Sequence, residues 1–229
     1  MSKPIARVVI SQSELFAGWP EPALARLVDA AEVLSFEEGA SLHRPGDAAE
    51  YLYLIAAGSL RLTRQSPSGR RFTAWLQFAG DFHGLGSVVT QTPHIYEAIC
   101  KGSTQLVRLP GSIIRDILRR DGNLALEMFA RFYRRHRNAV RLYETAATHG
   151  LRSRIAALLQ SVLVRSRRAG ANAAIDLSQD EIASMLGTRR QVVNRELRAI
   201  AASGAVRVDY GRITVLDAEA LSALALEAD

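Results

Sequence analysis

Cysteine is nearly absent from this sequence, with Cys100 alone among 229 residues. One cysteine cannot form an intramolecular disulfide, and it cannot by itself build a four-cysteine zinc or iron–sulfur site. Long apolar runs are also missing, and the N-terminal stretch MSKPIARVVISQSE lacks the continuous apolar core of a signal peptide. We therefore expect a cytoplasmic protein of one or two domains without a membrane partner.

Catalytic motifs are missing too, because the sequence contains neither a nucleophile elbow nor a phosphate-binding loop. His43, His83 and His94 lack the close spacing of the histidine and glutamate cluster in a metal-binding β-barrel enzyme. Each is therefore expected to be a surface or structural histidine, and no metal ligand or catalytic residue is predicted. A cupin-like metal enzyme remains a remote alternative, which predicts bound metal and turnover.

Lysine is absent from residues 150–212, although arginine is abundant there. This segment contains eleven arginines against five acids, an excess of six that equals the net charge of the whole chain. The five acids are Asp176, Asp180, Glu181, Glu196 and Asp209. A basic excess concentrated in one segment favours contact with nucleic acid over a merely solvated face.

The stretch LSQDEIASMLGTRRQVVNREL predicts two short helices joined by a tight turn. Ser178 with Glu181, and Thr188 with Gln191, each have the spacing of a capping box at a helix start. Gly187 lies between the two helices and supplies the turn. The stretch is therefore interpreted as a helix-turn-helix.

The second of these helices has two chemically different faces. Val193, Leu197 and Ile200 share one face at helical spacing, which anchors the helix to a core. Arginine pairs with guanine, and glutamine or asparagine with adenine, so the opposite face suits base recognition. That face carries Arg190, Gln191, Asn194, Arg195 and Arg198. We favour DNA recognition over an ordinary amphipathic helix with a hydrated basic side.

A β-hairpin is predicted directly after this helix. Ser203-Gly204 is a helix stop, and VRVDYGRITV alternates apolar and polar residues around a turn at Asp209 to Gly211. Arg207 and Arg212 lie on or beside the hairpin, where phosphate contact is expected. Together these features predict a winged helix-turn-helix. Its predicted DNA-binding residues are Ser178, Thr188, Arg189, Arg190, Gln191, Asn194, Arg195, Arg198 and Arg212.

Residues 33–110 have a different sequence pattern, in which glycines separate short runs that are apolar or alternate apolar and polar residues. YLYLI, SLRLT and FTAWLQF are typical of short strands between glycine turns. This pattern predicts a closed or sandwiched β-domain.

A long helix is predicted between these two regions, in NLALEMFARFYRRHRNAVRLYETAA, after a short one in GSIIRDILRR. Residues with a heptad period form a seam along the long helix. The seam is Ala125, Phe129, Phe132, His136, Ala139, Tyr143 and Ala146. We favour a dimer interface, the alternative being packing against the β-domain of the same chain.

In this order, the motifs resemble the Crp/Fnr transcription regulators over nearly the whole length. GDAAEYLYLIAAGSLRL followed by GDFHGLG is similar to the β-roll signature of that family. The resemblance implies an α+β fold with an N-terminal cyclic-nucleotide-binding-like β-roll (jelly-roll), a long dimerisation helix and a C-terminal winged helix-turn-helix. The expected domains are a sensor at 1–121, the dimerisation helix and hinge at 122–149, and the DNA-binding domain at 150–229.

The sequence departs from the members of this family that bind cyclic nucleotides. Those members carry Gly-Glu in the phosphate loop and an arginine before a later alanine, whereas this chain has Leu85 and Tyr96-Glu97 at those positions. Without the arginine, and with an added carboxylate, cyclic AMP is an unfavourable ligand. The residues at the family's effector-pocket positions are Gly84, Leu85, Gly86, Ser87, Tyr96, Glu97, Ala139 and Val140. The last two cannot hydrogen-bond a purine.

Other effectors stay open at this stage. The single cysteine excludes the four-cysteine cluster of the family's oxygen sensors, but any of five histidines could be an axial ligand of haem in a gas or redox sensor. An unknown effector, or none, is the other option. We expect a homodimer that binds a palindromic site in double-stranded DNA and works with RNA polymerase. A regulatory subunit that binds proteins through its β-domain would need neither wing nor recognition face.

Overall fold

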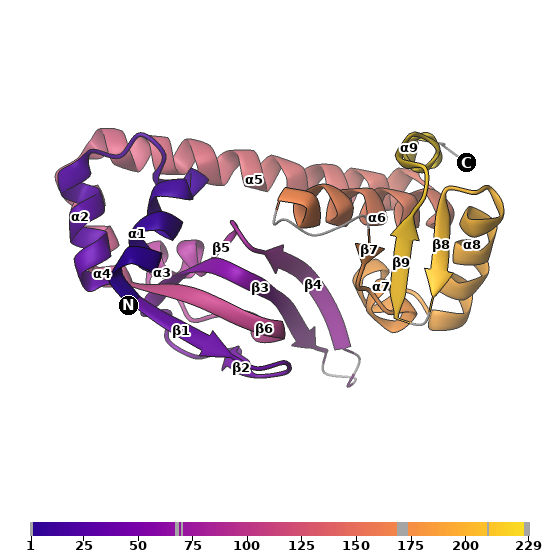
Figure 1. Ribbon diagram of the computed structural model, residues 1–229, viewed down its shortest axis with the longest axis horizontal. Helices are drawn as coiled ribbons and strands as arrows, with labels where there is room; N and C mark the ends of the chain where they lie inside the picture. Colours follow the sequence, from indigo (N-terminus) through magenta and orange to yellow (C-terminus); the bar gives the residue numbers. More distant parts are fainter. Residues whose placement is uncertain (1, 67–68, 70, 169–173, 210, 227–229) are drawn as a thin grey trace. The chain divides into compact units, whose positions relative to one another are not determined.

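The computed structural model describes residues 2–66, 69, 71–168, 174–209 and 211–226 (Figure 1). The chain forms two compact units. The first consists of Met1–Arg64 and Trp75–His136, and the second of Gln65–Ala74 and Arg137–Asp229. Within the described ranges, no helix is both long enough and apolar enough to cross a membrane.

The first unit is a β-sheet domain with helices at both of its ends in the sequence (Figure 1). The N-terminal helices are α1 (Ser2–Gln12), the 3-10 helix η1 (Glu14–Phe16) and α2 (Glu21–Ala30). The strands are β1 (Glu32–Phe36), β2 (Ser41–His43), β3 (Tyr51–Gln65), β4 (Arg71–Phe78), β5 (Phe82–His83) and β6 (Glu97–Pro110). Helix α3 (Leu85–Thr90) precedes β6, and α4 (Gly111–Arg120) follows it.

The strands form one sheet in the order β1-β6-β3-β4, to which β2 adds by pairing with β6 and β5 by pairing with β3. Strand β6 pairs antiparallel with β1, β2 and β3, and β3 pairs antiparallel with β5, as the alternating sequence pattern predicts. Because β2 and β5 join different strands of this sheet, residues far apart in the sequence are brought together at their ends. This topology confirms the expected β-roll.

One sequence expectation about this sheet was wrong. YLYLI and SLRLT are not separate strands divided by a turn at Gly58, because β3 continues through that glycine and pairs with β6 on both sides of it. The register shifts between Ile55 and Ser59, which makes this point a bulge. Gly58 has a φ of 75°, and a Cβ there would lie 2.5 Å from the Ser103 carbonyl oxygen. Only glycine fits both the backbone angle and the space.

The helices of the first unit cover one apolar core. Leu15, Leu27, Leu52, Leu109 and Ile114 are fully buried in it. Leu124 and Met128 also enter this core, so the N-terminal part of helix α5 (Gly122–Thr148) is anchored to the β-domain. Burying such side chains stabilises the unit by roughly 1.5 to 3 kcal/mol each.

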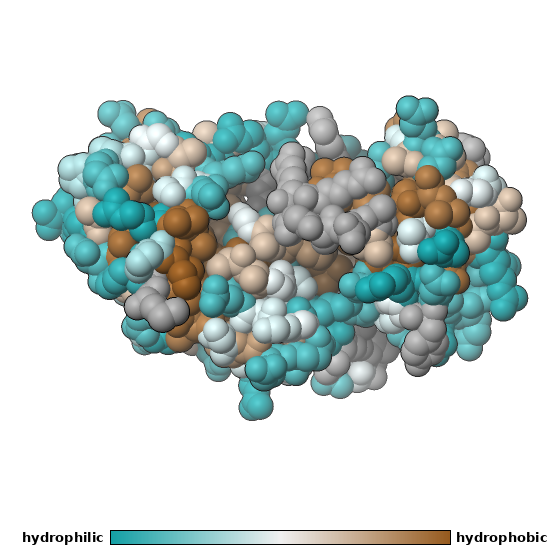
Figure 2. All heavy atoms as spheres, in the orientation of Figure 1, coloured by the Kyte–Doolittle hydropathy of each residue, from teal (hydrophilic) through white to brown (hydrophobic). Residues whose placement is uncertain are grey.

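The second unit contains the C-terminal half of α5 and the elements that follow it (Figure 1). These elements are α6 (Leu151–Arg168), β7 (Ala174–Ile175), α7 (Gln179–Leu186), α8 (Arg190–Ala202), β8 (Val206–Asp209), β9 (Arg212–Val215) and α9 (Ala218–Leu226). Strands β7, β9 and β8 form a small sheet in that order. Ile155, Leu159, Ile182, Val193 and Ile213 are buried in this unit. Its visible surface is mostly hydrophilic, with some apolar patches (Figure 2).

Candidate nucleic-acid interface and a buried histidine cluster

Helix α7 begins as the sequence predicts. The Ser178 hydroxyl accepts a hydrogen bond from the backbone N–H of Glu181, and the Glu181 carboxylate accepts one from the backbone N–H of Ser178 at 2.8 Å. Both halves of the capping box are therefore present. Gly187 ends the helix with a φ of 66°, a left-handed conformation that favours glycine.

Helix α8 does not begin as predicted. Its N-cap residue is Arg189, which makes no side-chain cap hydrogen bond, and Arg190 is the first helical residue. The predicted capping box of Thr188 and Gln191 is therefore wrong by one residue. The backbone N–H of Thr188 instead donates to the Ala183 carbonyl, which closes the turn after α7. This turn sets the start of α8, so Thr188 is too early for the cap.

The two faces of α8 are as predicted. Val193, Leu197 and Ile200 are buried, and they hold the helix against the unit's core. Arg190, Gln191, Arg195 and Arg198 are exposed on the helix, and Arg189 is exposed at its N-cap. Asn194 and Ser178 are half-buried, as is Thr188. Helix α8, the second helix of the helix-turn-helix, thus presents arginine and amide groups to solvent, and its buried face holds its backbone in place.

Some of these polar groups already have partners on α7. The Asn194 amide donates to Oε1 of Gln179 at 2.9 Å. Arg190 forms an exposed ion pair with Asp180 at 3.4 Å. Such an exposed pair is worth little, about 0 to 1 kcal/mol, so it does not prevent Arg190 from changing partners.

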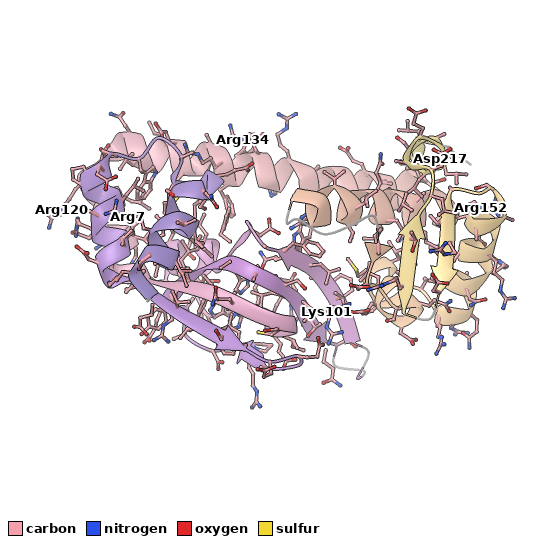
Figure 3. All side chains as sticks on the ribbon, viewed as in Figure 1. Arg7, Lys101, Arg120, Arg134, Arg152 and Asp217 are labelled. Carbon is pink, nitrogen blue, oxygen red and sulfur yellow. The ribbon has the colours of Figure 1, made fainter. Side chains whose placement is uncertain are left out.

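Glu196 is a buried carboxylate on α8, and the sequence analysis assigned it no role. Arg195 donates to its Oε1 at 2.8 Å, and Arg152 on α6 donates to its Oε2 at 3.1 Å. Figure 3 labels Arg152. Burial alone raises the pKa of Glu196, but the hydrogen bonds from Arg195 and Arg152 outweigh it and hold that pKa below its ordinary value. Glu196 therefore ties α8 to α6 and fixes Arg195.

The predicted hairpin is present as β8 and β9, paired from Val206↔Val215 to Asp209↔Arg212. Its turn includes Tyr210, which lies outside the described residues. Strand β7 adds to the other edge of β9, which the sequence did not predict. Arg212 is exposed and pairs with Asp176 at 2.9 Å, so both Arg212 and the exposed Arg207 lie at the surface. A groove of about 700 Å³ lies between α8 and β8, and Asn194, Arg198 and Arg207 contribute to its lining.

The predicted seam on α5 is largely exposed. Phe129 and Tyr143 are 65% and 75% exposed, and Phe132 is 42% exposed. His136 and Ala146 are also exposed, Ala125 is half-buried, and the side chain of Ala139 lies outside the described set. Apolar rings are thus left uncovered along α5, while Arg134 projects from its outer side (Figure 3).

The residues assigned to an effector pocket do not form a cationic cradle. Gly84 has a φ of 91° and caps α3, and Leu85 is buried in the core of the first unit. Gly86, Ser87 and Tyr96 are half-buried, and the Glu97 carboxylate accepts a hydrogen bond from the Ser41 hydroxyl at 3.4 Å. Val140 is exposed and belongs to the second unit, and the Ala139 side chain is not described.

The wide spacing of three histidines in the sequence led us to expect separate surface or structural residues, but the structure brings them together. His43, His83 and His94 are all buried, at 8%, 7% and 6% exposure, and they lie together in the first unit. Nε2 of His43 is 2.7 Å from Nε2 of His83, and the His43 and His94 rings stack with centroids 3.5 Å apart. The potential ligand atoms of all three lie within 4.8 Å of one another.

Backbone hydrogen bonds assemble this histidine cluster. His43 ends β2 and pairs with Ala98 of β6, while His83 ends β5 and pairs with Tyr53 of β3. The backbone N–H of His94 donates to the Asp47 carbonyl at 2.9 Å. No spacing along the sequence reveals these contacts, since they depend on which strands pair. Only the β-roll topology could have suggested them.

The environment of the cluster favours neutral imidazoles. Burial, with a smaller contribution from His94, lowers the pKa of His43 to about 4, although the Asp47 carboxylate opposes the shift. Burial also lowers the pKa of His94, again against Asp47. Neutral imidazole is the form that has a nitrogen lone pair available to bind a metal.

Comparisons with known proteins agree with both units. The Crp-like helix-turn-helix domain model matches residues 153–224, and the cyclic nucleotide-binding domain model matches residues 33–121. The cyclic AMP receptor protein of Thermus thermophilus is 28% identical over 190 residues, covering 83% of this chain and 86% of the relative. The global nitrogen regulator of Synechococcus elongatus is 28% identical over 197 residues, covering 83% of this chain and 88% of the relative.

Solved structures show the same fold. FixK2 from Bradyrhizobium japonicum superposes with a TM-score of 0.74 at 22% identity, covering 87% of this chain and 99% of that one. A cyclic nucleotide-binding β-domain, the long helix α5 and a Crp-like helix-turn-helix domain therefore follow one another in this chain. The chain belongs to the Crp/Fnr family of transcription regulators.

Proposed function

We propose that this protein is a homodimeric transcription regulator that reads an inverted repeat in double-stranded DNA through α8. The observation that carries the proposal is the exposed face of α8, where Arg190, Gln191 and Arg195 present base-reading groups opposite a buried apolar face. Arginine and glutamine side chains on a helix of this size fit the major groove. The wing, with Arg207 and Arg212, lies where phosphate contacts support such a helix.

Homodimer formation through α5 is part of the proposal. Phe129 and Tyr143 are mostly exposed although they follow a heptad period, and a second copy of the same helix would cover them. Two subunits related by a two-fold axis would then present two α8 helices to two half-sites. The proposed site of action is the cytoplasm, with RNA polymerase as the further partner.

The regulator is proposed to respond to an effector other than cyclic AMP. Leu85 is buried in the core, Tyr96 stands where an arginine is needed to bind a phosphate, and Glu97 adds a carboxylate beside it. Similarity to the relatives does not identify the effector either, because a cyclic AMP receptor protein and a global nitrogen regulator are both 28% identical to this chain.

A thermal shift titration tests the effector part. Millimolar cyclic AMP should give no saturable change in melting temperature, whereas a ligand at a hundred times its Kd stabilises a protein by about 2.7 kcal/mol. The matched control restores the family's phosphate contacts with Leu85→Glu, Tyr96→Arg and Glu97→Ser. A saturable shift in the unmodified protein contradicts this part of the proposal and leaves DNA binding untouched.

Selection of binding sites from random DNA tests the function itself. The protein should enrich a two-fold symmetric sequence, and Arg195→Ala should weaken binding to the best site by about 1 to 3 kcal/mol and relax one base position. Arg212→Ala, the control on the wing, should weaken all sequences alike. Failure to enrich any sequence, at low salt and with every effector candidate, contradicts the proposal.

A further inference from the structure

The histidine cluster brings the potential ligand atoms of three buried imidazoles together in one place. Three imidazoles with 6% to 8% exposure converge at one point, and their ligand atoms lie within 4.8 Å of one another. Two nitrogen ligands of a tetrahedral zinc ion are about 3.4 Å apart when each Zn–N bond is about 2.1 Å. The 2.7 Å contact between His43 and His83 is shorter than this value, and no two of the three ligand atoms are more than 4.8 Å apart.

One nitrogen of the cluster lacks a hydrogen bond of good geometry among the described residues. This nitrogen is Nδ1 of His43, which is buried. Nε2 of the same ring is hydrogen-bonded to Nε2 of His83 at 2.7 Å, one nitrogen donating and the other accepting when both rings are neutral. Buried polar atoms are normally satisfied, so a cluster of this kind favours a further partner for its lone pairs.

The surrounding charge suits a cation. The Asp47 carboxylate acts on both His43 and His94, and it is oriented by the backbone N–H of Arg44, which donates to it at 2.7 Å. Asp47 is not among the residues whose ligand atoms converge, so it contributes charge and not a bond. Neutral imidazoles near a carboxylate attract a cation that accepts nitrogen ligands.

The backbone holds the three ligands in place before any ion arrives. His43 and His83 are fixed by strand pairing to β6 and β3. His94 is fixed by two bonds between its backbone and the turn that follows β2, because its N–H donates to Asp47 and its carbonyl accepts from Gly46. Ligands held on rigid elements lose little freedom on binding, which favours affinity.

We propose that His43, His83 and His94 bind one divalent transition-metal ion of the zinc class, with a fourth position left for water or a small ligand. Imidazole nitrogen is a ligand of zinc, copper, nickel and iron, and it is a poor one for magnesium. Three protein ligands with an open fourth position are typical of sites at which a metal meets an exogenous molecule.

Metal binding requires a local rearrangement of the cluster. The 2.7 Å contact between His43 and His83 must lengthen, and one ring of the His43–His94 stack must turn so that its nitrogen faces the ion. The His94 ring lies close to Gly84, the N-cap of α3, since a Cβ added to that glycine would be 3.5 Å from the ring. Movement of the His94 ring would therefore act on the start of α3. The regulatory part of the inference rests on the proposed function: the ion, alone or with its fourth ligand, is the effector.

A metal titration of the full chain, free of affinity tags, tests the site directly. Metal-stripped protein should bind one Co²⁺ per chain with the absorption of a tetrahedral or five-coordinate ion, and Zn²⁺ should displace it while Mg²⁺ should not. His83→Asn and His94→Asn should each weaken binding about 100-fold or more, since loss of an outer contact alone costs 10-fold to 100-fold. His149→Asn, a histidine outside the cluster, should leave the affinity unchanged.

X-ray absorption of the zinc-loaded unmodified protein keeps the inference testable if either variant fails to fold. It should show three imidazole nitrogens around the ion. No binding to the unmodified protein, or equal affinity in the cluster variants and in His149→Asn, overturns the site.

DNA affinity measured with and without Zn²⁺ tests the regulatory part separately. We expect a change of about 5-fold to 150-fold on a selected site, the usual range of coupling between two sites. Tight metal binding with unchanged DNA affinity overturns the effector role and leaves the site intact. Absence of DNA binding in both states overturns the proposed function, while the metal titration still judges the site.

Discussion

Glu196 is a single residue on which the geometry of the recognition helix depends. It is buried, it binds Arg195 on the recognition face, and it binds Arg152 on a neighbouring helix. A buried carboxylate that loses such partners costs about 1 to 3 kcal/mol or more. The same residue therefore contributes to stability and restrains Arg195, the side chain proposed to read a base.

Glu196 also predicts how the stability of the protein depends on pH. Its pKa in the folded protein lies below the unfolded value of 4.5, because hydrogen bonds from Arg195 and Arg152 outweigh the opposing effect of burial. The stabilisation it provides is complete above that unfolded value, and it is lost as the pH falls through the lower folded value. Glu196→Gln should lower the melting temperature at neutral pH and flatten its decline in acid. Equal acid sensitivity in both proteins, measured by thermal unfolding, contradicts this role.

Gln191 predicts a change in base preference. Relatives of the Crp type commonly carry glutamate at this position, where its carboxylate suits the amino group of cytosine, while glutamine suits adenine. Gln191→Glu should therefore move the preference at one base pair from A·T toward C·G, leaving the position read by Arg195 unchanged. Site selection from random DNA with both proteins is the measurement. If both proteins select the same base at every position, Gln191 does not read DNA.

The starts of helices α7 and α8 allow a matched pair of substitutions. Ser178→Ala removes a capping-box hydroxyl and should cost about 1 kcal/mol. Thr188→Ala should cost much less, because the N-cap of α8 is Arg189 and not Thr188. Chemical denaturation of both variants tests the comparison. If both substitutions lower the free energy of unfolding equally, Thr188 does cap α8, as the sequence suggested.

Helix α5 gives a prediction about assembly. Phe129 is 65% exposed in the single chain, so Phe129→Arg should change the stability of one chain by less than about 0.5 kcal/mol. In a seam between two copies it would bring like charges together in apolar surroundings and should give monomers. Arg134→Ala, on the outer side of the helix, is the control. A single-chain mass for the unmodified protein at micromolar concentration, by light scattering, contradicts the dimer.

Elements with strong local signals were predictable, and those defined by distant pairing were not. The capping box at Ser178 and the glycine at Gly187 are encoded within a few residues, so α7 and its turn were correctly predicted. The turn predicted at Gly58 was wrong because glycine is common in both turns and bulges, and only the pairing of β3 with β6 distinguishes the two. The histidine cluster was missed for the same reason, since β2 and β5 join different strands of the sheet.

For the whole molecule, two-fold symmetry and charge predict how DNA is bound. Two subunits joined through α5 should protect half-sites centred about 34 Å apart, one turn of the double helix. The arginine excess of residues 150–212 should displace counterions, so affinity should fall steeply as salt rises. Footprinting and salt titrations on the selected site measure both. Protection of a single unrepeated site would contradict the symmetric arrangement.

The bond between Arg195 and Glu196 has a consequence for how the protein searches a genome. Arg195 must leave Glu196 before it can reach a base, and the cost of leaving is the same at every sequence. Only a guanine edge offers two acceptors in return, whereas Glu196 keeps Arg152 and is not left bare. If Arg195 reads a base as proposed, we expect the guanidinium to return to Glu196 at other sequences, which would shorten the dwell time on those sites. Competition between Glu196 and the bases for Arg195 should therefore speed the movement of the protein along DNA and make its binding more selective for guanine.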